Sequence, residues 1–403
     1  MIRSLKNFAH LLLAICANVV YGFPSRSMKM VGVTGTDGKT TTASLIYDIL
    51  QKSGKKVALL TTVSATIDGK SYDTGFHVTT PNSFALQKYI ALAKKASVHY
   101  FILETTSHGL DQNRVFGVHY AVSVVTNIAH EHLDYHKTYE KYVAAKAKII
   151  GVSDICIVNH DDISYPFLSQ NSKLATYGLH KDAGVTLEKY PLKISMPGLF
   201  NTYNALAALA VTMQLGVSYD IAKKTIETYQ TPKGRQDIVQ KNPYTVMIDF
   251  AHTPNSFQAL LSSLRVEYSG RIIHVFGSAG QRDHSKRASM GEISSQYSDI
   301  IVLTAEDPRN EKVEEINKEI RKGISDEFEV RSLESKGTQS KSLYQISDRK
   351  VAIEFALSLA QKGDVVVITG KGHEQTMNLG EGEFEWSDHE VVKKALEKKH
   401  DKK

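Results

Sequence analysis

The chain has 403 residues, of which 42% are hydrophobic, and a formal net charge of +6 from 49 Lys and Arg against 43 Asp and Glu. That length predicts two or three domains of roughly 150 residues each. The basic residues are dispersed and no aromatic side chains interleave with them, so nucleic-acid binding is not indicated; a phosphate-rich small substrate explains the charge equally well. Two cysteines, Cys16 and Cys156, are too few for a disulfide framework and favour a reducing compartment.

The amino-terminal residues imitate a secretory signal, because the weakly basic residues 1–10 precede an apolar run, Leu11–Val20. This run is too short to span a bilayer. The stretch Gly35-Thr-Asp-Gly-Lys-Thr40, which has the form of a phosphate-binding loop, follows closely. Such a loop indicates ATP chemistry, which belongs in the cytoplasm. We therefore predict a cytoplasmic protein that begins with an amphipathic helix ending at Tyr21, and secretion or weak contact of the helix with a membrane surface is the alternative.

A glycine-bounded turn then joins an apolar run to a stretch of helical character. Gly35 and Gly38 allow the backbone to approach a polyphosphate, and the following helix start adds its dipole. Lys39 supplies a charge to the outer phosphates, and the Thr40 hydroxyl can hold magnesium. A chance Gly-Lys-Thr in an ordinary strand-to-helix turn is the alternative. The predicted site for ATP and Mg²⁺ comprises Gly35, Thr36, Asp37, Gly38, Lys39, Thr40 and Thr41.

Apolar strands and helices alternate after this turn. Such alternation predicts a parallel sheet with its ligands at the carboxyl ends of the strands. The predicted strands are Lys56–Thr62, Tyr100–Thr105, Tyr120–Asn127 and Ile155–Asn159, the predicted helices are 79–95, 139–150 and 201–215, and a hairpin turn is predicted at Ile67–Lys70. The polar side chains expected on the carboxyl rim are Glu104, Thr106, Asn127, His130 and His132.

A second series of strands follows a connection at Thr231–Arg235. Its predicted strands are Thr245–Phe250, Arg271–Phe276, Asp299–Thr304 and Asp364–Thr369. We therefore predict an α/β chain in which a helix and linker (1–27) precede a P-loop ATPase domain with a mainly parallel sheet (28–232) and a Rossmann-like α/β domain (233–403). The basic residues 393–403 are expected to form a frayed helix end.

A series of motifs in chain order resembles the Mur ligase family, and most closely its MurE type. They extend from about Phe23 to about Glu390. The matching stretches are Gly35-Thr-Asp-Gly-Lys-Thr40, Thr79-Thr-Pro81, Glu104-Thr-Thr-Ser-His-Gly-Leu-Asp-Gln-Asn-Arg114, His132-Leu-Asp-Tyr-His136, Ala144-Ala-Lys146, Gly198-Leu-Phe-Asn-Thr-Tyr-Asn204, Gly234-Arg235, Asp249-Phe-Ala-His-Thr-Pro254, Arg282-Asp283, Asp307-Pro-Arg309 and Gly370-Lys-Gly-His-Glu374.

The resemblance implies a monomeric ligase of peptidoglycan precursor synthesis. ATP would phosphorylate a carboxylate of a UDP-N-acetylmuramoyl-dipeptide, and the amine of an amino acid would attack the acyl phosphate. An amide would form as ADP and phosphate leave. Preplaced cations and donors suit the negative charge that develops in such a reaction.

The resemblance also assigns the metal and catalytic residues. Thr40 and Glu104 match ligands of a first magnesium ion, and His132 matches a ligand of a second. Lys146 matches the lysine that the family carbamylates, which would make it a further anionic ligand; without the resemblance it would be taken as an exposed helix lysine. His136 is expected to be structural. The expected catalytic residues are Lys39, Glu104, His132 and Lys146.

The remaining matches assign three groups of binding residues. Asn204, Arg235 and Asp249 match contacts to base, phosphate and ribose, which implies ATP bound between two domains; helix capping is the alternative for Asp249. Residues matching the muramoyl-peptide site are Thr79, Thr80, Thr106 and Arg114. Residues matching the site of the incoming amino acid are Arg282, Asp307, Arg309, Gly370 and Glu374. The Arg309 guanidinium, which can pair bidentately with a carboxylate, favours meso-diaminopimelate over lysine.

Two departures from the family pattern bear on the substrates. Asp307 stands where an amide is usual, and this adds a negative charge at the amino-acid site. The family's full-length members carry an amino-terminal domain that binds the uridine nucleotide, and residues 1–27 resemble only the helix and linker that join this domain to the core. The alternatives are therefore a lipid-linked acceptor, an acceptor like that of cyanophycin synthetases, or a nucleotide-binding regulatory protein without ligase activity.

Overall fold

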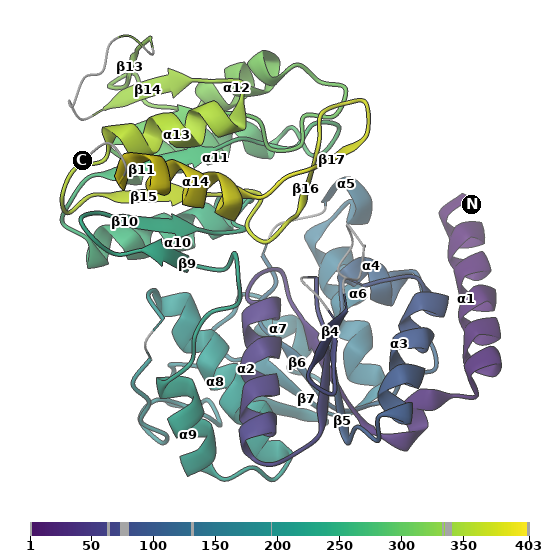
Figure 1. The fold of residues 1–403 in the computed structure, drawn as a ribbon. Helices are drawn as coiled ribbons and strands as arrows, with labels where there is room; N and C mark the ends of the chain where they lie inside the picture. The colour runs from purple at the N-terminus through teal and green to yellow at the C-terminus, as the bar shows by residue number, and fades with distance from the viewer. Residues whose placement is uncertain are drawn as a thin grey trace. The chain divides into compact units, whose positions relative to one another are not determined.

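The computed structural model describes residues 2–62, 65–72, 80–129, 133–194, 196–332, 334 and 341–400. The chain divides into two compact units (Figure 1). Unit 1 comprises Met1–Met196 and Phe200–Gln230, and unit 2 comprises Pro197–Leu199 and Thr231–Lys403. Within the described parts of the chain, no helix is both long and apolar enough to cross a membrane.

Unit 1 is built on a mainly parallel sheet, as the sequence predicts. Its described residues form eight strands in the order β4-β3-β2-β5-β1-β6-β7-β8. The strands are β1 (Lys29–Thr34), β2 (Val57–Leu60), β3 (Ala65–Ile67), β4 (Lys70–Tyr72), β5 (Tyr100–Glu104), β6 (Tyr120–Val125), β7 (Ser153–Asn159) and β8 (Leu174–Tyr177). Only β3 pairs antiparallel, with β2 and β4, and the β3–β4 hairpin confirms the predicted turn.

Helices cover both faces of this sheet. They are α1 (Ile2–Tyr21), η1 (Pro24–Ser27), α2 (Lys39–Lys52), α3 (Ser83–Lys95), α4 (Ser107–Asp111), α5 (Leu133–His136), α6 (Tyr139–Gly151), α7 (Tyr165–Leu168), α8 (Leu199–Gln214) and α9 (Tyr219–Glu227). Successive residues of a strand point to opposite faces. Val31 and Val33 of β1 accordingly join the core with α2, α8 and α9, whereas Met30 joins the core with α3 and α6.

The helix predicted over 79–95 begins later, at Ser83. The side chain of Asn82 accepts a hydrogen bond from the Ala85 N–H at 3.0 Å and thereby caps the helix. Capping by Asn satisfies one of the free amides of the first turn, and this fixes the start of α3.

Unit 2 has a second α/β sheet, with strand order β13-β14-β12-β11-β15-β10-β9 among its described residues. The strands are β9 (Asp237–Gln240), β10 (Thr245–Ile248), β11 (Ile272–Phe276), β12 (Ile300–Leu303), β13 (Glu329–Val330), β14 (Ser342–Gln345) and β15 (Val365–Ile368), and β16 (Thr376–Asn378) pairs with β17 (Glu383–Glu385). The helices are α10 (Pro254–Glu267), α11 (Lys286–Tyr297), α12 (Val313–Arg321), α13 (Arg349–Leu359) and α14 (Asp388–His400). The four predicted strands are confirmed as β10, β11, β12 and β15, and the sheet is parallel except for β9.

A fully buried ion pair ties together four elements of unit 2. Arg349, at the start of α13, donates to both carboxylate oxygens of Asp388 at 2.8 and 2.7 Å, and both side chains are 0% exposed. The same guanidinium donates to the carbonyls of Ala305 and Thr369 at 3.0 and 2.8 Å. These carbonyls follow β12 and β15, so the Arg349 side chain connects the ends of two strands to α13 and α14.

Loss of either partner should leave the other charge buried and uncompensated. We expect Asp388→Leu to lower the free energy of unfolding by about 3–5 kcal/mol. Lys398→Met, which breaks the exposed pair with Glu354, should cost less than about 1 kcal/mol. Urea unfolding followed by circular dichroism measures both, and equal losses would show that the buried pair does not have this structural role.

Candidate functional site

The predicted phosphate-binding loop joins β1 to α2 and requires glycine at two positions. Gly38 caps α2 with φ 78°, and a Cβ there would lie 2.2 Å from Oδ1 of Asn204. A Cβ on Gly35, whose φ is 154°, would lie 1.8 Å from Oγ1 of Thr126. Larger residues would therefore collide with the side chains that pack against the loop.

Residues at the end of β6 hold this loop in shape. The Thr36 N–H donates to the Asn127 carbonyl at 2.8 Å, and the Asp37 N–H donates to the Asn127 side chain at 2.9 Å. The Thr126 hydroxyl donates to the Asp37 carbonyl at 2.7 Å. Asn127 was predicted on the carboxyl rim without a role, and Thr126 was not predicted; its position directly after a strand was the available signal.

Lys39, Thr40 and Glu104 lie together at the start of α2. The Lys39 ammonium donates to the Thr36 carbonyl at 2.7 Å, so the side chain folds back along the loop. The Thr40 hydroxyl donates to Oε2 of Glu104 at 3.0 Å, and Glu104 is 1% exposed. The hydroxyl and carboxylate are thus adjacent oxygen donors, the type that Mg²⁺ prefers. The residues the structure describes include no cluster of three or more His, Cys, Asp and Glu suited to a metal, but His132 lies outside them.

Lys146 is buried beside the loop, so its interpretation as an exposed helix lysine is wrong. It is 2% exposed, and its ammonium donates to the Gly35 carbonyl at 2.6 Å. The ammonium also lies 4.7 Å from the centre of the Tyr142 ring, whose hydroxyl is hydrogen-bonded to Thr36 at 3.1 Å. Both residues are on α6, which therefore brings an amine to the base of the phosphate-binding loop.

The neighbouring His136, which is expected to be structural, lies inside unit 1. Its ring is fully buried, and its Nε2 is hydrogen-bonded to the Ser107 hydroxyl at 3.0 Å.

Three of the four residues assigned to the muramoyl-peptide are linked by hydrogen bonds. The Thr106 N–H and hydroxyl donate to Oγ1 of Thr80 at 2.9 and 3.2 Å. The Arg114 guanidinium donates to the Thr80 carbonyl at 2.8 Å. The Thr80 hydroxyl donates to the Glu104 carbonyl at 3.3 Å. These three residues therefore lie next to Glu104, whose carboxylate contacts Thr40. Thr79 lies outside the described residues.

Asn204 packs against the phosphate-binding loop from α8. Its Oδ1 accepts from the Thr42 hydroxyl at 3.2 Å, and its amide donates to Asn201 at 3.1 Å. The residue is 4% exposed. In this structure, its carboxamide therefore has protein partners next to Gly38.

Arg235 and Asp249 adjoin one another in unit 2. Both oxygens of Asp249 accept backbone N–H groups at 2.6 Å, one from Gln236 and one from Ala251. Thr253, rather than Asp249, caps α10, so the capping alternative is wrong. The Arg235 guanidinium lies 4.6 Å from the centre of the Phe250 ring.

The Gly370–Glu374 segment runs directly past this pair. A Cβ on Gly234 would lie 2.2 Å from the backbone nitrogen of His373, so the two chain segments are in close contact. The His373 ring is 4.9 Å from that of Phe250. Burial, with the positive charge of Arg235 second, lowers the pKa of His373 to about 3, so this imidazole is neutral. Residues assigned to the nucleotide and to the amino acid therefore share one part of unit 2.

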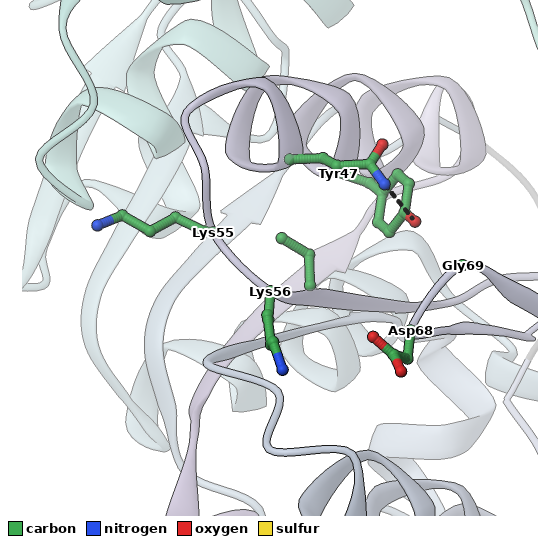
Figure 2. A pocket seen from close by; sticks show the side chains of 7 residues that line it. Tyr47, Lys55, Lys56, Asp68 and Gly69 are labelled. Atoms are coloured by element: carbon green, nitrogen blue, oxygen red, sulfur yellow. Dashed lines mark hydrogen bonds between the residues drawn. The ribbon is translucent and has the colours of Figure 1, made fainter.

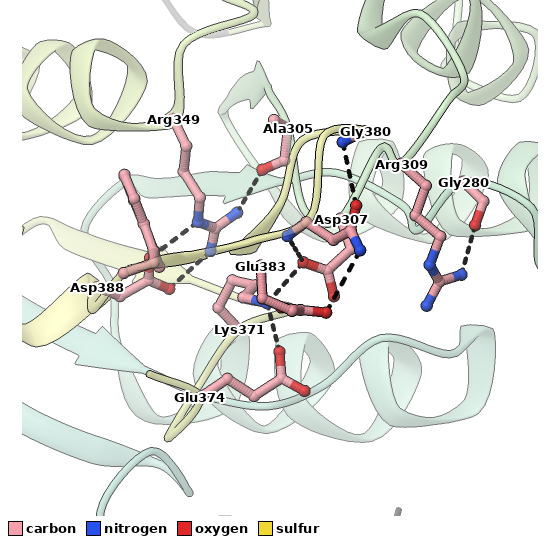
Figure 3. Close-up of polar contacts among 12 residues, drawn as sticks. Gly280, Ala305, Asp307, Arg309, Arg349, Lys371, Glu374, Gly380, Glu383 and Asp388 are labelled. Carbon is pink, nitrogen blue, oxygen red and sulfur yellow. Dashed lines mark hydrogen bonds and ion pairs between the residues drawn. The ribbon is translucent and has the colours of Figure 1, made fainter. Parts of the chain in front are cut away.

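The amino-acid group centres on Lys371, which sequence analysis did not assign although it lies in a matched motif. The Lys371 ammonium, 1% exposed, lies 2.8 Å from Asp307 and 2.5 Å from Glu374 (Figure 3). Asp307 also accepts the N–H of Asn378 at 3.0 Å. Burial is the largest single effect and acts to lower the pKa of Lys371, but the charges and hydrogen bonds of the two carboxylates together outweigh it and raise the pKa, so the lysine stays charged. The negative charge that Asp307 adds is thus compensated by this lysine.

Arg309 lies beside this cluster on the loop after β12. Its guanidinium donates to the Gly280 carbonyl at 2.6 Å, and Figure 3 shows the side chain pointing away from Asp307 and Lys371. The Gly280 N–H in turn donates to the Asp307 carbonyl at 2.8 Å, which joins the loops after β11 and β12. Arg282 is exposed and follows Gly280 by two positions. The structure therefore brings Asp307, Gly370 and Glu374 together, with Arg309 next to them and Arg282 on the rim of the loop.

A surface hollow elsewhere in unit 1 contains none of these residues. It is lined by Tyr47, Gln51, Lys55, Lys56, Val57, Asp68 and Gly69 (Figure 2). Residues 47–57 belong to the carboxyl-terminal half of α2 and to the start of β2, and Asp68 and Gly69 form the turn between β3 and β4. This is the end of the sheet opposite the phosphate-binding loop.

The fold and site define a P-loop α/β protein with a second α/β unit. The sequence profile of the Mur ligase middle domain matches residues 33–212, and that of the Mur ligase, glutamate ligase domain matches residues 234–372. The UDP-N-acetylmuramoyl-L-alanyl-D-glutamate-2,6-diaminopimelate ligase 1 of Clostridium acetobutylicum is 34% identical over 408 residues, covering 95% of this chain and 81% of that protein. A UDP-N-acetylmuramyl-tripeptide synthetase of Borrelia garinii subsp. bavariensis is 38% identical, covering 94% and 78%.

Solved structures agree with this result. A UDP-N-acetylmuramoyl-L-alanyl-D-glutamate-2,6-diaminopimelate ligase has a TM-score of 0.62 and 27% identity, covering 93% of this chain and 79% of that one. The folylpolyglutamate synthase of Mycobacterium tuberculosis has a TM-score of 0.70 and 18% identity, covering 90% and 96%, and shares the fold. The chain belongs to the Mur ligase family, and it is therefore an ATP-dependent ligase that forms amide bonds.

Glu306, which precedes Asp307, was not assigned from sequence. It is 7% exposed, and its Oε2 has no hydrogen-bond partner among the described residues. Burial raises the pKa of Glu306 from 4.5 to about 7, with Lys286 as the main opposing charge. Between pH 4.5 and about 7, the Glu306 carboxyl is therefore mostly protonated in the folded protein and mostly ionised in the unfolded chain.

This shift makes a prediction about stability and pH. Because the folded state binds the proton more tightly, the contribution of Glu306 to stability should fall as the pH rises from 4.5 through about 7. Glu306→Gln should abolish that fall. Above about pH 7, the free energy of unfolding of this variant should exceed that of the wild type by up to about 3 kcal/mol. Urea unfolding across this pH range tests it, with exposed Glu381→Gln as the control. Parallel curves for wild type and Glu306→Gln would contradict the shift.

Proposed function

We propose that this ligase adds an amino acid, meso-diaminopimelate, to a UDP-N-acetylmuramoyl-dipeptide during peptidoglycan precursor synthesis. The observation that carries the proposal is similarity along 95% of the chain to a ligase named for this reaction, together with the cluster of Lys39, Thr40, Glu104 and Lys146. We place the reaction in the cytoplasm and in a monomer.

The phosphate-binding loop is assigned to the β- and γ-phosphates of ATP. Backbone N–H groups at the start of α2 would donate to the phosphates, and Lys39 would swing from the Thr36 carbonyl to meet their charge. Preplaced donors of this kind stabilise the charge that moves between the carboxylate and the phosphoryl group. The residue types and positions support this role.

Thr40 and Glu104 are assigned to Mg²⁺, and their hydrogen-bonded oxygen atoms fit such an ion. Bound there, Mg²⁺ would neutralise charge on the phosphates during transfer. His132 is assigned to a second ion. Lys146 is proposed to join it as a carbamate; its buried amine at the loop is consistent with a group that acts at this site.

The other ends of the substrates are assigned to surrounding residues. Asn204 is proposed to contact the base of ATP, Arg235 a phosphate and Asp249 the ribose. Thr79, Thr80, Thr106 and Arg114 are proposed to bind the muramoyl-peptide. The hydrogen bonds that Thr80 accepts from Thr106 and donates to the Glu104 carbonyl support a substrate carboxylate close to the phosphate-binding loop.

The incoming amino acid is assigned to the cluster around Lys371. Asp307 and Glu374 supply acceptors for an ammonium, and Arg309 supplies a guanidinium for a second carboxylate. Gly370 and Arg282 complete the assigned group. A substrate with one ammonium and a distal carboxylate fits this combination, and it is the reason for preferring meso-diaminopimelate to lysine.

The direct test is phosphate release with ATP, Mg²⁺ and UDP-N-acetylmuramoyl-L-Ala-D-Glu, with and without meso-diaminopimelate, followed by mass analysis. We expect release only with both substrates, and a product heavier by one diaminopimelate residue. No release with diaminopimelate or lysine would contradict the proposed acceptor and direct the search to another carboxylate.

Lys39→Ala should abolish turnover, with a loss of at least about 1000-fold, because the transition-state charge loses its cation. Steady-state phosphate release measures this, and circular dichroism checks the fold. Exposed Lys55→Ala, beyond the other end of α2, is the matched control and should keep wild-type activity. Amide formation by Lys39→Ala at the control rate would remove the loop from the mechanism.

Arg309→Ala should raise the KM for meso-diaminopimelate by about 10- to 100-fold, since a charge-assisted pair with the distal carboxylate is lost. The KM for ATP should change little. Arg321→Ala, an exposed arginine at the end of α12, is the control. An equal rise in KM for ATP and the amino acid would be inconsistent with this assignment.

A further inference from the structure

His274, on β11, is a fully buried histidine outside the residues assigned to substrates. Its ring is 0% exposed and contacts two phenylalanine rings, with centre-to-centre distances of 4.5 Å to Phe276 and 4.8 Å to Phe257. Burial lowers the pKa of His274 to about 3, so the imidazole is uncharged. A neutral imidazole has one N–H donor and one acceptor nitrogen, and both need a partner at a buried position.

Both nitrogens of His274 are hydrogen-bonded to hydroxyls from other elements. Nδ1 is bonded to the Ser294 hydroxyl on α11 at 2.9 Å, and Nε2 is bonded to the Thr369 hydroxyl at 3.0 Å. Ser294 and Thr369 are also 0% exposed. The imidazole therefore forms a buried polar link from α11 through β11 to the residue that directly follows β15.

Thr369 is the last residue before the chain enters the segment assigned to the amino acid. Its N–H donates to the Val275 carbonyl at 2.9 Å, and its carbonyl accepts from Arg349 at 2.8 Å. The bond to His274 adds a contact to its side chain. Thr369 is thus held through both its backbone and its hydroxyl.

The two residues after Thr369 lie in closely packed surroundings. Gly370 has a φ of 103°, and a Cβ there would lie 2.9 Å from Oε2 of Glu306. Lys371 then places its ammonium 2.8 Å from Asp307. Because a buried charge pair depends on good geometry, a shift at Thr369 that moves this turn would weaken the cluster around Lys371.

We propose that His274 is a positioning residue for the incoming amino acid, on which it acts through Thr369. By holding the Thr369 hydroxyl, it sets the point at which the chain leaves β15 and so the place of the cluster around Lys371. The inference rests on the proposed assignment of the amino acid to that cluster. A histidine needed only for packing would contribute to stability and leave the binding of the amino acid unchanged.

Two amide substitutions separate the two ends of the imidazole. The amide of His274→Gln can reach the position of Nε2 and keep the bond to Thr369, whereas that of His274→Asn reaches only the position of Nδ1, beside Ser294. We expect His274→Asn to raise the KM for the amino acid by about 10-fold, because the buried Thr369 hydroxyl loses its partner. For His274→Gln this KM should stay within about 3-fold of the wild type, and for both variants the KM for ATP should change by less than about 3-fold. Steady-state phosphate release measures these values.

Substitutions of Thr369 are an independent test, since they do not alter the buried ring. Thr369→Val nearly keeps the shape of the side chain but removes the hydroxyl, so it should also raise the KM for the amino acid by about 10-fold. Thr369→Ser keeps the hydroxyl and is the matched control. Thr369→Val combined with His274→Asn should raise this KM no further than either change alone, because both break the same bond.

The outcomes distinguish this inference from the proposed function. The assay uses whichever amino acid supports phosphate release by the wild type, so failure of meso-diaminopimelate would overturn the proposed substrate and leave the comparison of variants in place. Urea unfolding checks that each variant is folded, and the Thr369 pair decides if His274→Asn is not. An unchanged KM for the amino acid in folded Thr369→Val would overturn the inference. Equal KM values for His274→Asn and His274→Gln, or an equal rise in the KM for ATP, would also limit His274 to a structural role.

Discussion

The phosphate-binding loop keeps its shape because polar groups from neighbouring elements hold it. Thr126 and Asn127, at the end of β6, bind its backbone, and Lys146 on α6 binds the Gly35 carbonyl at 2.6 Å. Glu104 ends β5 and meets the Thr40 hydroxyl at 3.0 Å. Parallel strands bring their carboxyl ends to one edge, so residues distant in sequence converge on the loop. The proposed ATP site is supported by this convergence.

In unit 2, a buried side chain likewise holds together the residues that follow the carboxyl ends of parallel strands. The buried Arg349 binds the carbonyls that follow β12 and β15, and the polar residues of the amino-acid group come directly after those carbonyls. Asp307 and Lys371 then pair at 2.8 Å. Because Arg349 holds the two strand ends together, the carboxylate of Asp307 lies next to the ammonium of Lys371. A carboxylate buried there without a positive partner would be strongly destabilised by the loss of its hydration.

Sequence patterns were sufficient to predict the strands that carry both sites. Long apolar runs such as Tyr120–Val125 and Ile272–Phe276 have few alternatives to a buried strand, and the glycine spacing at Gly35 and Gly38 indicates phosphate binding before any contact is known. The strands β9, β13 and β14 were missed because they mix polar with apolar residues, whereas the equally short β10, β12 and β15 are continuous or nearly continuous apolar runs.

The residues that support the two sites were harder to predict, because their sequence surroundings do not show that they are buried. Lys146 lies among other lysines on an amphipathic helix, and only the folded structure shows that its amine is buried. Arg349 and Lys371 likewise have sequence surroundings typical of surface residues, and their roles depend on contacts with residues 39 and 64 positions away. Long-range contacts of this kind are set by topology, which local patterns do not encode.

In the proposed reaction, ATP activates a substrate carboxylate as an acyl phosphate, and transfer of oxygen from that carboxylate to phosphate is the decisive measurement. The acceptor carboxylate is labelled with ¹⁸O, and the phosphate released during amide formation is examined by mass spectrometry. We expect one labelled oxygen to move from the carboxylate to the phosphate, since the amine displaces that oxygen with the phosphoryl group. Unlabelled phosphate, released while the acceptor keeps all its label, would show that ATP is simply hydrolysed and would rule out the acyl phosphate.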